Sequence, residues 1–198
     1  MAKFTLPLVL IISLFALFSI ASSVSIQDSK SVSFIKSSCN VTLYPTLCVQ
    51  SLSIFSSTIQ TSPRTMAQTA LAVSLSSART ANKFIVKISK SKQMKKREYL
   101  VVQDCIVNLG SCLDSLTKSM SELGNMGHGE SFIFHMSNVQ TWVSAALTDE
   151  NTCMDGFAGK AMDGRLKSSI KSRLTNVAKV TSNALALVNR FANEQLLS

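Results

Sequence analysis

The chain has 198 residues, of which 46% are hydrophobic and 16% are charged, with 20 Lys and Arg against 11 Asp and Glu. An intrinsically disordered chain would be less apolar and more charged, and a collagen would have far more than 7 glycines. The 5 cysteines are too sparse for a small fold held together mainly by disulfides. We therefore expect one globular domain with a net charge of +9.

The N-terminal segment has a short basic start followed by an apolar run. Lys3 precedes the run at residues 4–20, and the small residues Ala21 and Ser23 occupy the two positions that a signal peptidase reads. This pattern predicts a secretory signal peptide at residues 1–23. The alternative is a membrane anchor, but the run is at the short end of the ~20 residues that a span needs, and no charged stop follows it. We expect an exported chain without a membrane span in its mature form.

Residues 24–61 follow as a short N-terminal extension. Within it, Asn40-Val41-Thr42 is an N-glycosylation sequon, so Asn40 is a candidate acceptor in an exported chain. A tight disulfide loop at the neighbouring Cys39 would hide this acceptor.

The next two segments repeat apolar or small residues at alternating steps of three and four, which predicts amphipathic helices. The first covers residues 64–89, with Ser62 as a candidate N-cap and Pro63 at the first helical position. Its expected buried residues are Ala67, Leu71, Ser74, Ala78, Ala81, Ile85 and Ile88. The second begins at Arg97 and ends at Gly124. Its expected buried residues are Tyr99, Val102, Ile106, Leu109, Leu113, Leu116, Met120 and Leu123.

Two more helices complete the predicted fold after a glycine-rich loop at residues 124–129. The third expected helix buries Phe132, Met136, Val139, Val143, Ala146 and Leu147, and Gly156 and Gly159 mark its end. The last begins near Asp163 and buries Leu166, Ile170, Leu174, Val177, Thr181, Ala184, Leu187 or Val188, and Phe191. Because proline is absent after Pro63 and the first glycine is Gly110, turns between strands are poorly supported. We predict an all-α protein, with an up-and-down four-helix bundle at residues 62–198.

Export also changes how the cysteines are interpreted, because an oxidising compartment lets them pair. Residues seven apart on one helix lie ~10.5 Å apart, so Cys105 cannot reach Cys112. The simplest local pair is Cys39 with Cys48. Cys153 then pairs with Cys105 or with Cys112, and either loop contributes about 3 to 4 kcal/mol. No CxxC spacing exists and both histidines are far from any cysteine, so we expect no metal site.

The sequence offers little for catalysis, because it lacks the common nucleophile, metal and phosphate-binding motifs. We interpret His128 as an exposed loop residue and His135 as a residue at the helix boundary rather than as a ligand.

A basic cluster extends from the end of the first helix into the following connector: Lys83, Lys87, Lys90, Lys92, Lys95, Lys96 and Arg97. Export and the scarcity of nearby aromatic residues argue against nucleic acid. The cluster is either a solvated helix end or a site of salt-sensitive retention by a polyanionic matrix.

Two stretches, at residues 39–48 (CNVTLYPTLC) and 138–157 (NVQTWVSAALTDENTCMDGF), resemble the plant invertase and pectin methylesterase inhibitor family. A weaker third match includes Asp104-Cys105 and the leucines that follow, and the resemblance spans residues 31–197. It implies an antiparallel four-helix bundle preceded by a helical hairpin. It also implies disulfides joining Cys39 to Cys48 and Cys105 to Cys153, with Cys112 as a free thiol. We expect this thiol to be buried and the protein to be a monomer.

The resemblance implies an inhibitor rather than an enzyme, with no cofactor, and no enzyme domain follows the matched motif. Inhibitors of pectin methylesterase lay bundle helices across the enzyme's pectin cleft in a one-to-one complex. The matching residues here are Asp114, Thr152 and Asp155, whereas Val107 and Ser111 stand where acidic residues are found in the best-known inhibitors.

We therefore expect a secreted inhibitor of pectin methylesterase in the plant apoplast and cell wall. Inhibition of acid invertase is the alternative, although the Pro-Lys-Phe tripeptide associated with that branch is absent. A third possibility, of another class, is a basic wall protein that binds acidic pectin or membrane directly. We would expect such a protein to associate weakly with acidic pectin through electrostatic attraction.

Overall fold

A computed structural model describes residues 29–91, 94–158 and 164–197. The predicted signal peptide at residues 1–23, Gly159 and the predicted helix start near Asp163 lie outside the described residues. Within them, residues 29–39 are helical, and no β-strand is present. The further elements are α2 (Pro45–Leu52), the short 3-10 helix η1 (Ser53–Phe55), α3 (Ser56–Ile59), α4 (Pro63–Ser89), α5 (Lys96–Gly124), α6 (Glu130–Gly156) and α7 (Arg165–Leu196).

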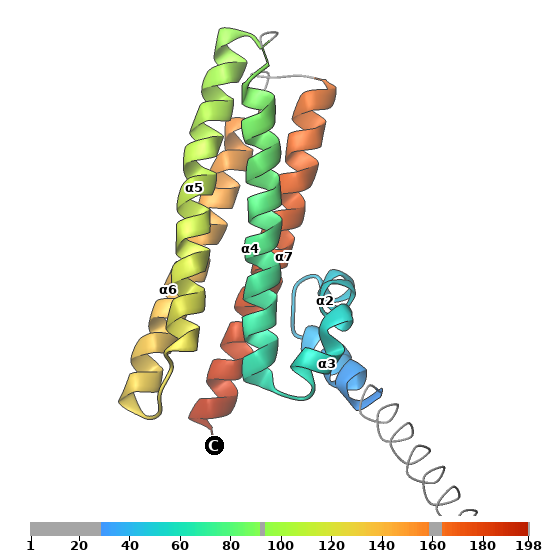
Figure 1. The fold of residues 1–198 in the computed structure, drawn as a ribbon, viewed down its shortest axis with the longest axis vertical. Helices are drawn as coiled ribbons and strands as arrows, with labels where there is room; N and C mark the ends of the chain where they lie inside the picture. Colours follow the sequence, from blue (N-terminus) through green and yellow to red (C-terminus); the bar gives the residue numbers. More distant parts are fainter. Residues whose placement is uncertain (1–28, 92–93, 159–163, 198) are drawn as a thin grey trace, which may run out of the picture.

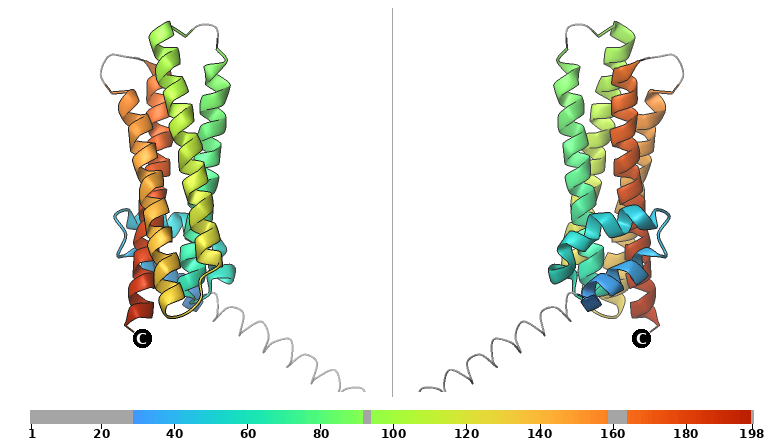
Figure 2. Two further views of the ribbon diagram at one scale, coloured as in Figure 1. Left: turned by 90° about the vertical axis from the view of Figure 1, so that its left-hand side faces the viewer. Right: turned by 90° about the vertical axis from the view of Figure 1, so that its right-hand side faces the viewer.

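The four long helices form an antiparallel bundle in which consecutive helices are neighbours and α7 returns to pack against α4 (Figures 1 and 2). The N-terminal helices lie across one end of this bundle, where α2 packs on α4 and α7 and α3 packs on α4. This arrangement confirms the predicted all-α bundle with an N-terminal helical hairpin. The division of the chain at residues 61 and 62 stays a prediction. No helix of the described residues is long and apolar enough to cross a membrane.

The first helix of the bundle begins at the residues that the sequence indicated. Pro63 is the first helical residue, and the Ser62 hydroxyl accepts a hydrogen bond of 3.2 Å from the backbone N–H of Thr65. This bond satisfies one of the donors that the first turn leaves without an intrahelical partner. The local sequence therefore marks where α4 starts.

We expect Ser62→Ala to lower the free energy of unfolding by about 1 kcal/mol, because the Thr65 N–H loses its acceptor. Chemical denaturation followed by circular dichroism measures this loss. Thr61→Ala removes a hydroxyl from the adjacent exposed residue and serves as the matched control. Equal stabilities of the two variants would contradict the capping role of Ser62.

The buried side of α5 is rotated from the predicted one. Val102, Leu109, Leu116 and Leu123 are buried as expected. Between them, however, the buried residues are Cys105, Cys112, Ser115 and Ser119. The predicted Ile106, Leu113 and Met120 are only half-buried. Tyr99 is 44% exposed, so its predicted burial is wrong. The small cysteine and serine side chains allow close approach to the neighbouring helices, and the larger residues beside them fill the edges of the core.

Two apolar clusters fill the bundle along its length. The cluster beside the N-terminal hairpin includes Ile35, Leu52 and Ile59 from the hairpin together with residues of all four long helices. The cluster at the other end includes Phe157 and Leu174. The hairpin therefore completes the core at one end of the bundle.

Specific bonds fasten the hairpin to the bundle. The Cys39–Cys48 disulfide closes its turn, with the two Cα atoms 5.6 Å apart. The buried Asn183 side chain on α7 accepts a hydrogen bond from the Tyr44 N–H at 3.1 Å and donates one to the Tyr44 carbonyl at 3.0 Å. These two bonds give both backbone groups of a turn residue a partner from a helix far away in the sequence.

Candidate functional site

Charge is distributed unevenly around the bundle. The sequences of α5 and α6 contain eight Asp or Glu and three Lys or Arg, whereas those of α4 and α7 contain one Glu and ten Lys or Arg. Because α5 is the neighbour of α6 and α4 the neighbour of α7, these pairs form opposite sides of the molecule. The bundle thus has an acidic side and a basic side, and the predicted partner-binding residues belong to the acidic side.

Contacts between α5 and α6 show which residues of α5 border α6. The Lys118 ammonium lies 4.5 Å from the centre of the Trp142 ring, and the Glu122 carboxylate contacts both His135 and Asn138. Trp142 is therefore half-buried at the helix border rather than fully in the core. Positions that precede Lys118 by steps of three and four share this edge of α5. We define the α5–α6 face as the exposed residues Val107, Ser111, Asp114 and Lys118 of α5 and Thr152 and Asp155 of α6.

Thr152 and Asp155 lie close together on this face, because they are three residues apart on α6 and both are exposed. They flank Cys153, whose disulfide to Cys105 joins α6 to α5 with the Cα atoms 4.4 Å apart. The Thr152 hydroxyl donates a hydrogen bond of 2.8 Å to the Thr148 carbonyl, which fixes its rotamer. The covalent link holds this part of the face rigid.

Asp114 lies apart from this pair. It is nine residues beyond Cys105 on α5, a rise of about 13.5 Å along the helix. Its carboxylate forms an exposed ion pair of 2.7 Å with Lys118, which contributes little to stability. Val107 and Ser111 are placed between Asp114 and the disulfide, and Val107 is 70% exposed. The candidate residues thus form one elongated face rather than a compact cluster.

His135 takes part in a polar contact between helices that the sequence did not reveal. Its Nδ1 lies 2.6 Å from the Glu122 carboxylate, and the Asn138 amide donates to the same oxygen at 3.3 Å. Hydrogen bonds from His135 and Asn138 hold the pKa of Glu122 below its usual value. His128 is exposed in the loop before α6, as expected. Among the described residues, no cluster of three or more His, Cys, Asp or Glu side chains is arranged to hold a metal ion.

The Cys39–Cys48 turn does not bury Asn40, which is exposed, whereas Thr42 of the sequon is buried. The Thr42 hydroxyl donates a hydrogen bond of 2.7 Å to the Cys39 carbonyl. Glycosylation of Asn40 stays a prediction.

At the other end of the bundle, all described members of the basic cluster are exposed: Lys83, Lys87, Lys90, Lys95, Lys96 and Arg97.

A buried polar layer crosses the bundle, and sequence analysis missed its central residue. Each long helix contributes one side chain to this layer: Ser74, Cys112, Glu150 and Thr181. The Glu150 Oε1 accepts hydrogen bonds from the Thr181 hydroxyl at 2.8 Å and from the Cys112 thiol at 3.4 Å. The Ser74 and Thr181 hydroxyl oxygens are 2.6 Å apart. The Glu150 Oε2 is buried without a hydrogen-bond partner in the described chain.

Burial governs the ionisation of this layer. It raises the pKa of Glu150 to about 7, against the opposing effect of the hydrogen bonds from Thr181 and Cys112. Burial, together with the nearby Glu150 carboxyl, also raises the pKa of the free Cys112 thiol. The thiol is therefore protonated and inert, and it serves as a hydrogen-bond donor in the core.

Comparisons with known proteins agree with the helical-bundle fold. A protein-family model described as plant invertase/pectin methylesterase inhibitor matches residues 33–187. The chain is similar to the 21 kDa protein of Daucus carota, with 52% identity over 161 residues, which cover 80% of this chain and 83% of that protein. It is also similar to pectinesterase inhibitor 9 of Arabidopsis thaliana, with 48% identity over 198 residues, which cover 98% and 96% of the two chains.

Among solved structures, the fold resembles the crystal structure of mutant form A of a pectin methylesterase inhibitor from Arabidopsis. The TM-score is 0.62, the sequence identity is 20%, and the match covers 76% of this chain and 92% of that chain. At this identity the similarity concerns the fold alone.

Proposed function

The chain belongs to the plant invertase/pectin methylesterase inhibitor family, and from this premise we propose that it inhibits pectin methylesterase by covering the enzyme's pectin cleft in a one-to-one complex. The observation that carries the choice of target is the near full-length similarity to pectinesterase inhibitor 9 of Arabidopsis thaliana. The chain acts without chemistry of its own, as a rigid protein surface that excludes the polysaccharide from the cleft.

The α5–α6 face is the proposed contact surface. Its two helices are joined by the Cys105–Cys153 disulfide, so little conformational freedom is lost when the complex forms. The seven acidic residues of α5 and α6 other than the buried Glu150 favour a partner surface of positive potential and speed the encounter with it. The exposed side chain of Val107 provides apolar contact area among these polar residues. We place the complex in the plant cell wall, on the predicted export of the chain.

The test of this function is a titration of the purified protein against a plant pectin methylesterase and an acid invertase in parallel. We expect a stoichiometric loss of pectin methylesterase activity at one inhibitor per enzyme and unchanged invertase activity. The reverse pattern would favour the alternative target. Full activity of both enzymes across the acidic range would overturn the proposal.

We expect the Thr152→Ala/Asp155→Ala variant to raise the inhibition constant for pectin methylesterase by about tenfold or more, because both side chains lie on the rigid end of the α5–α6 face. Inhibition assays and thermal melts of the same samples separate lost binding from lost folding.

The matched control is Thr69→Ala/Glu194→Ala, which carries the same kinds of change on α4 and α7. Thr69 makes the same hydrogen bond to the carbonyl four residues earlier, at 2.8 Å, and Glu194 is the acidic residue of α7. This control should inhibit like the unmodified protein. An unchanged inhibition constant for the folded Thr152→Ala/Asp155→Ala variant would remove both residues from the contact surface.

A further inference from the structure

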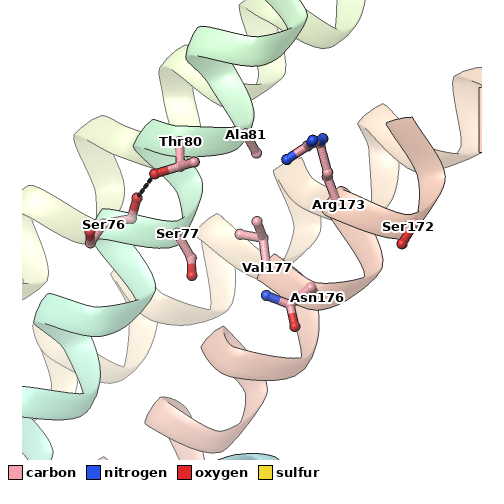
Figure 3. Close-up of a pocket in the computed structure, with 8 residues that line it drawn as sticks. All are labelled: Ser76, Ser77, Thr80, Ala81, Ser172, Arg173, Asn176 and Val177. Carbon is pink, nitrogen blue, oxygen red and sulfur yellow. Dashed lines mark hydrogen bonds between the residues drawn. The ribbon is translucent and has the colours of Figure 1, made fainter. Parts of the chain in front are cut away.

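A polar groove lies on the basic side of the bundle, between α4 and α7, and the proposed inhibitor function does not use it. Its volume is about 410 Å³, within the range of small-molecule and sugar sites. The lining residues are Ser76, Ser77, Thr80, Ala81, Ser172, Arg173, Asn176 and Val177. Figure 3 shows the Ser77 hydroxyl, the Asn176 amide and the Arg173 guanidinium reaching into the space between the two helices. We call this feature the α4–α7 groove.

Arg173 is positioned for an anionic ligand. Its guanidinium carbon lies 4.1 Å from the centre of the Phe84 ring, and this cation–π contact holds the planar group at the groove. No ion pair of the described residues involves Arg173, and α4 contains no acidic residue at all. A fixed guanidinium without an internal carboxylate partner is suited to bind an external carboxylate through two parallel hydrogen bonds.

Further cations continue the groove along the helix axes in both directions. Lys83 and Lys87 follow Thr80 by three and seven residues, so they extend the same stripe of α4 toward its C-terminus. Lys179 follows Asn176 by three residues on the antiparallel α7 and extends the groove toward the hairpin, where its ammonium lies 5.1 Å from the Tyr44 ring. A chain of regularly spaced anions laid along the groove would meet a cation at its middle and at both ends.

We propose that the α4–α7 groove binds an acidic polysaccharide made of uronate residues, the chemistry of pectin after its methyl esters have been removed. Arg173 and the flanking lysines pair with the carboxylates. The hydroxyls of Ser76 and Ser77 and the Asn176 amide both donate to and accept from the sugar hydroxyls, whereas the Thr80 hydroxyl, which donates to the Ser76 carbonyl at 2.9 Å, can only accept. This surface is separate from the α5–α6 face, so one molecule can hold the polysaccharide on one side and the enzyme on the other.

The lining of the groove argues against other polyanions. A single-stranded nucleic acid needs exposed aromatic rings on which bases stack, and the Phe84 ring is covered by Arg173. A membrane surface needs an apolar rim to insert, whereas the apolar residues of the groove are Ala81 and Val177, both buried. A site that binds any polyanion through charge alone needs only cations, whereas a sugar acid also uses hydroxyl and amide groups beside them, which this groove provides.

The experiment measures the affinity of the purified protein for polygalacturonate, at low and at physiological ionic strength. We expect the Lys83→Gln/Arg173→Gln variant to bind at least about tenfold more weakly than the unmodified protein. The matched control, Lys30→Gln/Lys36→Gln, removes the same charge from two exposed residues of the N-terminal helix and should stay within about twofold. Equal losses in the two variants would show binding through net charge alone and would overturn the groove as a site.

A second variant separates sugar recognition from charge. Ser77→Val/Asn176→Leu keeps every cation, and we expect it to weaken polygalacturonate binding by about threefold or more because two hydrogen-bonding side chains are lost. Unchanged binding by this variant would overturn the assignment of a sugar site. The assignment would also be overturned if the unmodified protein bound highly methylesterified pectin, a sulfated polymer or vesicles of anionic phospholipid as tightly as polygalacturonate.

Inhibition assays keep this inference distinct from the proposed function. The groove variants should inhibit pectin methylesterase as the unmodified protein does, because Lys83 and Arg173 lie on the side opposite the α5–α6 face. Intact inhibition with no polygalacturonate binding would overturn the groove proposal alone. Polygalacturonate binding without any inhibition would overturn the proposed function alone.

Discussion

The Cys105→Ala/Cys153→Ala variant should unfold with a free energy about 4 kcal/mol lower than that of the unmodified protein. The disulfide joins residues 48 positions apart, and closing a loop of this length removes that much conformational freedom from the unfolded chain in the entropy model. Alanine is the suitable replacement, because both cysteines are buried and a serine hydroxyl would need a hydrogen-bond partner in the core. Denaturant unfolding under identical oxidising conditions measures the difference.

The Cys39→Ala/Cys48→Ala variant is the matched comparison, because it removes the other disulfide by the same substitutions. Its loop spans only 9 positions, so the same model gives a loss of about 2.5 kcal/mol. We therefore expect the bundle disulfide to stabilise the protein more than the hairpin disulfide does. A smaller loss for the Cys105→Ala/Cys153→Ala variant than for the hairpin variant would contradict this order.

The bundle disulfide also concerns function, since Cys153 lies between Thr152 and Asp155. Without denaturant, the Cys105→Ala/Cys153→Ala variant should remain folded but hold Thr152 and Asp155 less rigidly. A larger inhibition constant for this folded variant would then measure how much the disulfide contributes to preorganising the α5–α6 face.

The four long helices were predictable because their signals are local. Each apolar stripe repeats within one helix, and Ser62 with Pro63 marks the start of α4 by chemistry confined to a single turn. The disulfides followed from the resemblance to a known family, while the residues alone left Cys153 with two partners. The rotation of α5 toward Cys105 and Cys112 depends on how closely its neighbours pack, and a single helix sequence does not contain that information.

Features that depend on distant residues were not predictable. The bonds between Tyr44 and Asn183 join residues 139 positions apart, and nothing in either local sequence indicates the other. The opposite charges of the two sides became visible only once α4 was placed beside α7 and α5 beside α6. The α4–α7 groove likewise needs both helices, because each contributes only half of its polar lining.

Glu150 is an intermediate case, because a local signal existed and was outweighed. It stands in the polar run Asp149-Glu150-Asn151, which is typical of a solvated helix face. However, it is four residues after Ala146 and three before Cys153, both of which are buried on the same stripe of α6. The spacing of Glu150 is thus typical of a buried residue, whereas its residue type is typical of an exposed one. The structure follows the spacing and provides donors from Thr181 and Cys112.

We expect this buried carboxyl to make the stability of the protein depend on pH. Its pKa in the folded protein is about 7, above the ordinary value of 4.5, so the folded state holds its proton where the unfolded state has lost it. The stabilising contribution is complete below pH 4.5 and is lost as the pH rises through 7. The difference in pKa corresponds to a loss of about 3 kcal/mol in the free energy of unfolding.

The Glu150→Gln variant isolates this effect, because a glutamine has the shape of the protonated glutamic acid and cannot ionise. Its amide oxygen can still accept the hydrogen bonds from Thr181 and Cys112. We expect the variant to match the unmodified protein at acidic pH and to exceed its stability by about 3 kcal/mol above neutrality. Urea unfolding of both proteins across the range from pH 4 to 8 measures the two profiles.

Glu130→Gln provides the control, since it removes an exposed carboxylate from the start of the same helix without touching the polar layer. It should retain the pH profile of the unmodified protein. If Glu150→Gln instead shows the same decline toward neutral pH as the unmodified protein, another group is responsible for it. Because the neutral form of Glu150 is the one that the core accepts, we expect the contribution of this residue to the free energy of unfolding to be largest at acidic pH, the range in which the proposed complex with the enzyme is to be tested.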